Sequence, residues 1–134
     1  MIPSTNSILS TSIEVEKQPS KNYELHIEQD LVSGFCDGLQ AMRQVIYKIL
    51  NTERYQHIIY SWNYGIELID LYGEPVTYVC PELQRRIEEA LIQDDRIESV
   101  DSFDFDISEK RTIKATFTVH TIFGDVEAEK VVNF

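Results

Sequence analysis

The sequence has few of the residues that hold together disulfide-rich or zinc-binding proteins. It contains two cysteines, Cys36 and Cys80, which lie far apart in the 134 residues and outside any CxxC pair. This spacing argues against a disulfide framework and against a zinc site. We therefore expect a chain made in a reducing cytoplasm, with both thiols acting as small apolar side chains.

Long apolar runs and positive charge are also scarce. No run approaches the roughly 18 apolar residues of a membrane span, and no basic segment followed by an apolar core marks a signal peptide. Twelve Lys and Arg residues oppose 23 Asp and Glu residues, which gives a formal net charge of -11. Because binding to phosphate backbones and anionic membranes depends on Lys and Arg, we expect neither nucleic acid nor membrane among the partners.

The common catalytic and cofactor signatures are missing as well. The chain has no GxSxG, Walker loop, GxGxxG or HExxH sequence. Its three histidines, His26, His57 and His120, fall in separate predicted elements, so we expect no metal site and no cofactor. The sequence therefore favours a protein that is not an enzyme.

Paired carboxylates are the one catalytic feature that this acidic sequence supplies. Glycosidases use two carboxyl groups about 5 to 10 Å apart, and Glu53, Glu67 and Asp70 surround a glycine-flanked middle segment. Surface carboxylates and helix-end charges explain the same residues more simply. A peptidoglycan-cleaving enzyme that uses Glu53 or Asp70 stays open as an alternative.

A change in composition divides the chain into an N-terminal arm, residues 1–22, and one domain, residues 23–134. Twelve of the first 22 residues are Ser, Thr, Asn, Gln or Pro, so the arm buries too little apolar surface to order itself alone. It either frays or orders against a partner or the domain surface. The remaining residues suffice for a single hydrophobic core.

Three stretches of the domain carry helix signals. Asp37 and Gln40 form the pattern of a capping box, and apolar residues at spacings of three and four predict a helix up to about residue 52. A shorter helix is expected over residues 66–72, before a glycine stop. A third helix is expected to begin near Pro81, since proline is tolerated in a first turn.

Alternating apolar and polar residues predict strands, three of which follow one another at the C-terminal end. The alternation slips by one residue between Val100 and Phe103, which predicts a bulge or bend. The order of elements predicts an α+β fold, with helices on one face of a small mixed or antiparallel sheet that ends in a three-stranded meander. The predicted strands cover residues 23–27, 57–60, 103–107, 113–120 and 126–132.

Two charged motifs stand where predicted helices end. Glu53 and Arg54 follow the first long helix, and Asp94, Asp95 and Arg96 follow the third. Acids at the negative end of a helix dipole are unfavourable by up to about 1 kcal/mol unless a cation is near. The planar arginine group suits either an internal clamp on the helix exit or a contact with a partner protein.

The C-terminal strand stays apolar to its last residue. Val131, Val132 and Phe134 are unusual in a free tail. An uncovered edge of a three-stranded sheet is also a template for another chain's strand. The strand therefore either packs within the domain or completes a sheet with a partner.

Several motifs together carry a family resemblance that runs from about Pro19 to the C-terminus. The motifs are the runs 19–23, 34–41, 48–55 (KILNTERY), 59–61 (IYS), 63–65 (NYG) and 95–97. With these motifs the chain resembles the XkdS-like branch of the baseplate wedge, or sheath-initiator, family of contractile phage tails and phage-tail-like bacteriocins. Family members typically carry Glu-Pro-Arg before the first meander strand, where this chain has Asp94, Asp95 and Arg96 and so lacks the proline.

The resemblance implies a structural role in a baseplate. Such proteins form a ring of six copies around the tail tube, attach to wedge proteins and present strands to the first ring of sheath protein. They are assembled in the bacterial cytoplasm and end in the baseplate of the released particle. Some relatives carry a lysozyme-like label, which keeps the enzyme alternative open, and a regulatory protein-binding module on the same fold is a second alternative.

The resemblance also gives the charged motifs a hypothetical role. Arg96 with Asp94 would fix a loop that faces the wedge, and Arg54 with Glu53 would anchor the middle segment. The hairpin 113–134 would offer its edge to strands of the sheath.

Overall fold

The computed structural model describes residues 20–133. A hairpin of β1 (Asn22–His26) and β2 (Leu31–Cys36) precedes helix α1 (Gly38–Leu50), with the 3-10 turn η2 (Ile27–Gln29) between the two strands. A long loop leads through the 3-10 turn η3 (Ile69–Leu71) to helix α2 (Val76–Ile92). The meander of β3 (Ile97–Asp106), β4 (Thr112–Thr121) and β5 (Gly124–Asn133) follows, in the order β3-β4-β5.

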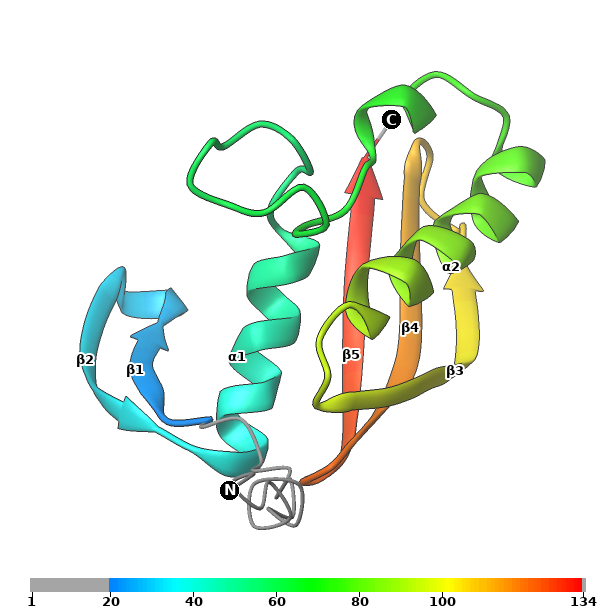
Figure 1. Ribbon diagram of the computed structural model, residues 1–134. Helices are drawn as coiled ribbons and strands as arrows, with labels where there is room; N and C mark the ends of the chain where they lie inside the picture. The colour runs from blue at the N-terminus through cyan, green and yellow to red at the C-terminus, as the bar shows by residue number, and fades with distance from the viewer. Residues whose placement is uncertain (1–19, 134) are drawn as a thin grey trace, which may run out of the picture.

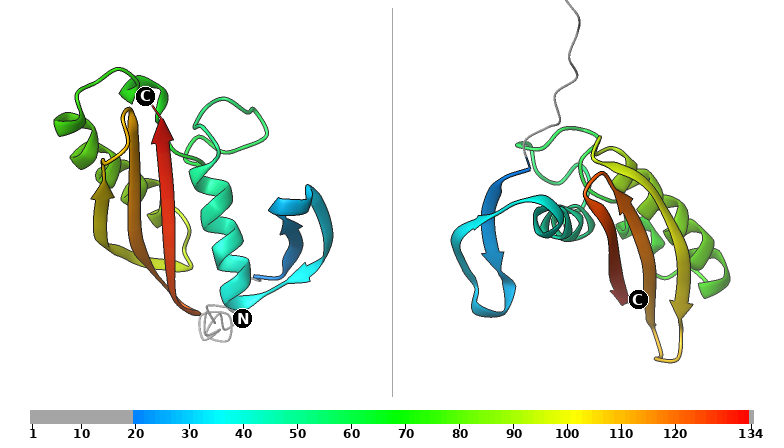
Figure 2. Two further views of the ribbon diagram at one scale, coloured as in Figure 1. Left: turned by 180° about the vertical axis from the view of Figure 1, so that it is seen from behind. Right: turned by 90° about the horizontal axis from the view of Figure 1, so that it is seen from below.

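The two helices cover one face of the meander and leave the other face open (Figure 1, Figure 2). β4 alternates buried residues toward the helices with exposed or half-buried residues outward. Its buried Phe117 and Val119 join Met42 of α1 and Leu83 of α2 in one core cluster. The predicted α+β fold with a three-stranded antiparallel meander is confirmed.

The N-terminal hairpin stands apart from the meander, on the far side of α1 (Figure 1). A two-stranded hairpin is marginal by itself in water, and here it is tied to the helix by Gln44. The Gln44 side chain accepts from the Leu25 amide at 2.9 Å and donates to the Tyr23 carbonyl at 2.7 Å. β2 was missed from the sequence because Gly34, which adopts φ 75°, was read as part of a loop.

Helix α1 begins where the capping pattern predicts, but the two bonds of the capping box do not form. The Asp37 side chain accepts from the Gly38 amide at 2.7 Å. Gln40 does not reach back to the cap; its amide donates to Glu24 of β1 at 2.7 Å instead. Gln40 therefore binds the N-terminal hairpin and does not cap the helix.

Helix α2 begins five residues earlier than predicted. Its N-cap is Pro75, and Pro81 lies inside the helix rather than at its first position. The Pro75 carbonyl accepts from the amides of Tyr78 and Val79, which closes the first turn before Pro81. The missing amide of Pro81 removes a single intrahelical bond from a helix that is held mainly by its buried residues.

The predicted helix over residues 66–72 and the predicted strand over residues 57–60 are both wrong. In residues 66–72 only the turn η3 is helical, because Ile66 pairs in a parallel bridge with Glu53. Residues 57–60 close a turn in which the Tyr60 amide donates to the His57 carbonyl at 3.2 Å. The predicted bulge is confirmed, since the β3–β4 register shifts between Asp101 and Asp104.

Candidate functional site: a groove beside the edge strand β5

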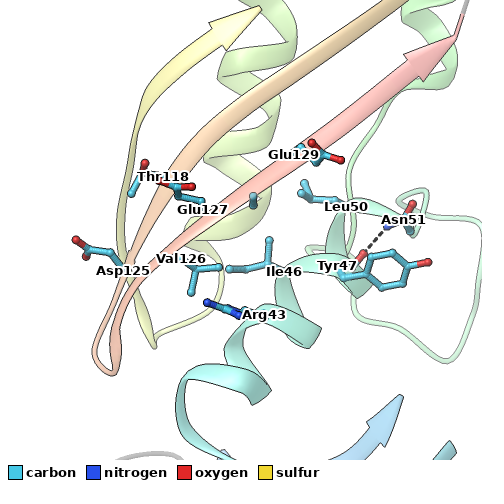
Figure 3. Close-up of a pocket in the computed structure, with 11 residues that line it drawn as sticks. Arg43, Ile46, Tyr47, Leu50, Asn51, Thr118, Asp125, Val126, Glu127 and Glu129 are labelled. Carbon is cyan, nitrogen blue, oxygen red and sulfur yellow. Dashed lines mark hydrogen bonds between the residues drawn. The ribbon is translucent and has the colours of Figure 1, made fainter. Parts of the chain in front are cut away.

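Strand β5 lies at an edge of the meander, next to helix α1. Within residues 20–133 it pairs with β4 alone. Between its other side and α1 lies an open groove of about 770 Å³ (Figure 3). An edge strand exposes unpaired backbone donors and acceptors, so this groove adjoins a row of backbone groups that a further strand can pair with.

The helix wall of the groove is apolar at its base and polar at its rim. Ile46 and Leu50 of α1 are buried at the base, where Ile46 points toward Val126 of β5 (Figure 3). Arg43 and Tyr47 stand at the rim and are exposed. The spacing of three and four residues that puts this stripe on one helix face was visible in the sequence.

The strand wall has two chemically different faces because side chains alternate along β5. Val126 and Ala128 point toward the helices, and small Ala128 leaves room in the groove. Lys130 continues that inner face and donates to Asn51 at the end of α1, with Nζ and Oδ1 3.2 Å apart. Burial lowers the pKa of Lys130, with Glu53 acting in the opposite direction.

The outer face of the sheet is acidic. Asp125, Glu127 and Glu129 of β5 stand opposite His120, Thr118 and Thr116 of β4. Lys114 pairs with Glu129 at 2.9 Å, whereas the side chain of Glu127, whose backbone lies in the ladder with Thr118, forms no ion pair or hydrogen bond within the described residues. The face therefore presents acids along the rim of the groove.

His120 ties the three strands together on this outer face. Its Nδ1 lies 2.7 Å from an Asp125 oxygen and its Nε2 lies 2.9 Å from an Asp101 oxygen. The bond to Asp125 and then the bond to Asp101 raise the pKa of His120, against the effect of burial. Because a carboxylate faces each ring nitrogen, the arrangement favours the imidazolium form.

The apolar residues at the end of β5 divide between core and surface. Val132 is buried in the core cluster, while Val131 is 45% exposed on the outer face. Phe134 lies outside the described residues, as does the expected arm up to residue 19. The last strand therefore packs within the domain, and its edge away from β4 pairs with no strand of residues 20–133.

The Asp94–Arg96 motif forms a clamp at the exit of α2. The two side chains make a two-pronged pair, with Arg96 Nε 2.9 Å and Nη2 2.7 Å from the Asp94 oxygens. Burial acts to raise the pKa of Asp94, but the bonds from Arg96 outweigh it and lower that pKa. Asp95 points to solvent, and the Arg96 carbonyl accepts from Ile122 in the β4–β5 turn at 3.0 Å.

The Glu53–Arg54 motif clamps the middle segment to the end of α1. Glu53 accepts from the Leu68 amide at 2.9 Å, and Arg54 donates twice to the Gly65 carbonyl. Arg54 also pairs with Glu89 of α2 at 3.0 Å. Both charged motifs thus act inside the domain in this structure.

The candidate carboxylates of the enzyme alternative are held by structural contacts. One Glu53 oxygen accepts from the backbone of the middle segment. Arg86 donates to both Asp70 oxygens and to the Glu67 carbonyl. The Arg86 bonds lower the pKa of Asp70, against a small effect of burial, whereas a general acid needs a raised pKa.

One surface was missed from the sequence. The loop after the Glu53–Arg54 motif exposes large apolar side chains, with Ile58 and Ile59 almost fully accessible and Trp62 81% exposed. Tyr55 lies 5.8 Å from Trp62 between ring centroids. The adjacent apolar residues Ile58, Ile59 and Tyr60 were the signal, but they were assigned to the predicted strand 57–60.

This arrangement describes a small structural protein with an open sheet edge and no assembled catalytic pair among its described residues. The family model described as contractile injection system sheath initiator matches residues 11–124. The chain belongs to this family and is a structural component of a contractile tail. It is 38% identical over 127 residues to the phage-like element PBSX protein XkdS of Bacillus subtilis (strain 168), covering 90% of this chain and 89% of that protein.

Proposed function

We propose that this protein links the baseplate wedge to the first ring of sheath and starts sheath assembly there, without catalysing a reaction. The observation that carries this proposal is the unpaired edge of β5 beside the groove. In strand addition, backbone hydrogen bonds supply affinity, and pockets for alternate side chains supply specificity. The β5 edge offers the backbone groups, and the groove beside α1 offers the pocket.

The wedge side of the protein is assigned to the clamped part of the domain, residues 53–96. The Asp94–Arg96 pair fixes the exit of α2 and leaves Asp95 exposed beside it. The Glu53–Arg54 clamp holds the base of the exposed loop that carries Trp62. Rigid loops of this kind suit contacts with wedge proteins, and six copies would then surround the tail tube.

The proposed role also implies where the protein is found. Within residues 20–133, neither helix has the length and hydropathy to cross a bilayer. Assembly in the bacterial cytoplasm, followed by a place in the baseplate of the released particle, fits a protein that joins wedge, tube and sheath.

Two substitutions in assembling particles test the two sides separately. Ala128→Trp fills the groove and should give baseplates without sheath, because the edge can no longer accept a strand. Arg96→Ala should leave the domain folded but block baseplate assembly. Ser108→Trp, in the β3–β4 turn, is the matched control and should give normal particles by electron microscopy. Sheathed particles from Ala128→Trp would contradict the edge assignment, and intact baseplates from Arg96→Ala would contradict the wedge assignment.

The enzyme alternative has its own test. Purified protein should give no clearing of peptidoglycan in a zymogram, because Glu53 and Asp70 are engaged in structural bonds. Clearing that disappears in Glu53→Gln would overturn the structural assignment.

A further inference from the structure

We propose that the β5 groove selects a strand with apolar side chains on one face and Lys or Arg side chains on the other. This inference rests on the proposed strand addition and names the chemistry of the strand. A strand paired with β5 would direct alternate side chains toward α1 and toward the outer face of the sheet. The surface toward α1 and the outer face of the sheet differ in polarity and charge.

The side toward α1 favours apolar residues. A strand laid beside β5 would meet buried Ile46 and Leu50 on the helix and half-buried Ala128 on its neighbour. Two cations lie near this side: Arg43 at the rim of the helix wall, and Lys130, which continues the inner face of β5 and donates to Asn51. Burying apolar side chains there is favourable because it removes apolar surface from water.

The outer side favours basic residues. The incoming strand would place its other side chains next to Asp125, Glu127 and Glu129, which follow one another on the outer face of β5. His120 and Lys114 partly neutralise the first and the last, but Glu127 has no partner within the described residues. Opposite charges side by side on adjacent strands are stabilising, and like charges are destabilising.

This charge pattern disfavours two other occupants. A second copy that pairs its β5 with this one would bring two rows of Glu127 and Glu129 together on one face. The chain's own arm carries Glu14 and Glu16 alternating with Ile13 and Val15. Its acids would therefore share the outer face with those of β5 if its apolar residues faced α1.

Binding of synthetic peptides to the full chain tests the proposal. Three fluorescent peptides have ten residues, the length of β5: one alternates Val and Lys, one alternates Val and Glu, and one has the Val and Lys residues in scrambled order. The Val-Lys peptide should bind at least about tenfold more tightly than the other two, since several cross-strand charge pairs act together. Its binding should shift the amide resonances of β5 and should weaken as salt is added.

Charge reversal supplies the matched control. Glu127→Lys with Glu129→Lys should reverse the preference toward the Val-Glu peptide. Asp104→Lys with Glu109→Lys makes the same change in net charge away from β5, at positions exposed on β3 and in the β3–β4 turn, and should keep the Val-Lys preference.

The outcomes separate this inference from the function on which it rests. Equal binding of the Val-Lys and Val-Glu peptides at β5, or equal binding of the scrambled peptide, would overturn the charge pattern while leaving strand addition in place. Tighter binding of a peptide with the sequence of residues 10–19 would identify the chain's own arm as the occupant and overturn the inference. If no peptide shifts the β5 resonances, both the inference and the proposed strand addition fail.

Discussion

The clamped side of the molecule, residues 53–96, and its open side, the groove with the outer sheet face, use charge in opposite ways. On the clamped side, Arg54, Arg86 and Arg96 each bind a partner within the domain and are largely buried. On the open side, acids outnumber cations, and Glu127 has no partner among the described residues. Four of the six arginines of this acidic chain form ion pairs on the clamped side.

The two regions differ in how their backbone groups are satisfied. Residues 53–71 contain one short 3-10 turn and a single β-bridge, so side chains must satisfy the backbone groups that regular structure would otherwise pair. The open side has a regular ladder on one flank of β5, and no strand of residues 20–133 pairs with the other flank. Charge thus fixes an irregular loop in one region and lines the proposed docking surface in the other.

The largest effect on the clamped side is expected from Gly65→Ala. Gly65 has φ 91°, and a Cβ there would lie 2.5 Å from the Thr52 carbonyl oxygen. Strained φ and a backbone clash together should lower the free energy of unfolding by about 3 kcal/mol or more, measured by urea denaturation. Gly73→Ala is the control, since Gly73 has φ 89° but no atom within 4 Å of the added Cβ. Equal losses in the two variants would show that the close approach of the chain at Thr52 contributes nothing.

A smaller loss is expected from Arg54→Met. The substitution keeps the length of the side chain but removes two bonds to the Gly65 carbonyl and the pair with Glu89. Leaving that carbonyl short of donors should cost about 1–3 kcal/mol in urea denaturation. Arg85→Met removes exposed pairs with Glu82 and Glu89 on α2 and should lower the free energy of unfolding only slightly. If Arg54→Met has no larger effect than Arg85→Met, the clamp does not stabilise the domain.

The two regions also differ in how well the sequence predicted them. The helix over residues 38–50 and the meander were predicted because their apolar residues repeat at 3.6 and 2.0 positions. The middle segment was mispredicted because its conformation depends on contacts that no local pattern encodes. Glu53 accepts a hydrogen bond from the Leu68 amide fifteen residues away, and Arg86 of α2 donates to Asp70.

The candidate site was predictable only in part. The possibility of an open meander edge followed from the order of elements and from the apolar residues at the C-terminal end. The groove itself depends on where α1 lies relative to β5 and on the small side chain of Ala128, which the periodicity of either element does not determine. The proposed interface residues Arg54 and Arg96 were correctly placed at helix ends, but their partners emerged only from the fold.

The smallest effect, and the one that contrasts the two sides most directly, is expected from pH. On the open side, a raised pKa of His120 means that its stabilising contribution is complete below about 6.5 and is lost as the pH rises through the raised value. On the clamped side, the bonds from Arg85 and then Arg86 lower the pKa of Glu82 to about 2. That contribution is present above 4.5 and is lost as the pH falls toward about 2.

Amide exchange should therefore show the β4–β5 turn loosening first as the pH rises above 6.5, and the middle of α2 around Glu82 and Arg85 loosening first as the pH falls toward about 2. Asp125→Asn removes the largest contribution to the raised pKa of His120, so in that variant the loosening on raising the pH should begin at lower pH while the acid response stays the same. A histidine titration by NMR reads the His120 pKa directly. A His120 pKa at or below 6.5 in the unmodified protein, or an alkaline response that Asp125→Asn leaves in place, would mean that the carboxylates flanking the ring do not hold the three strands together.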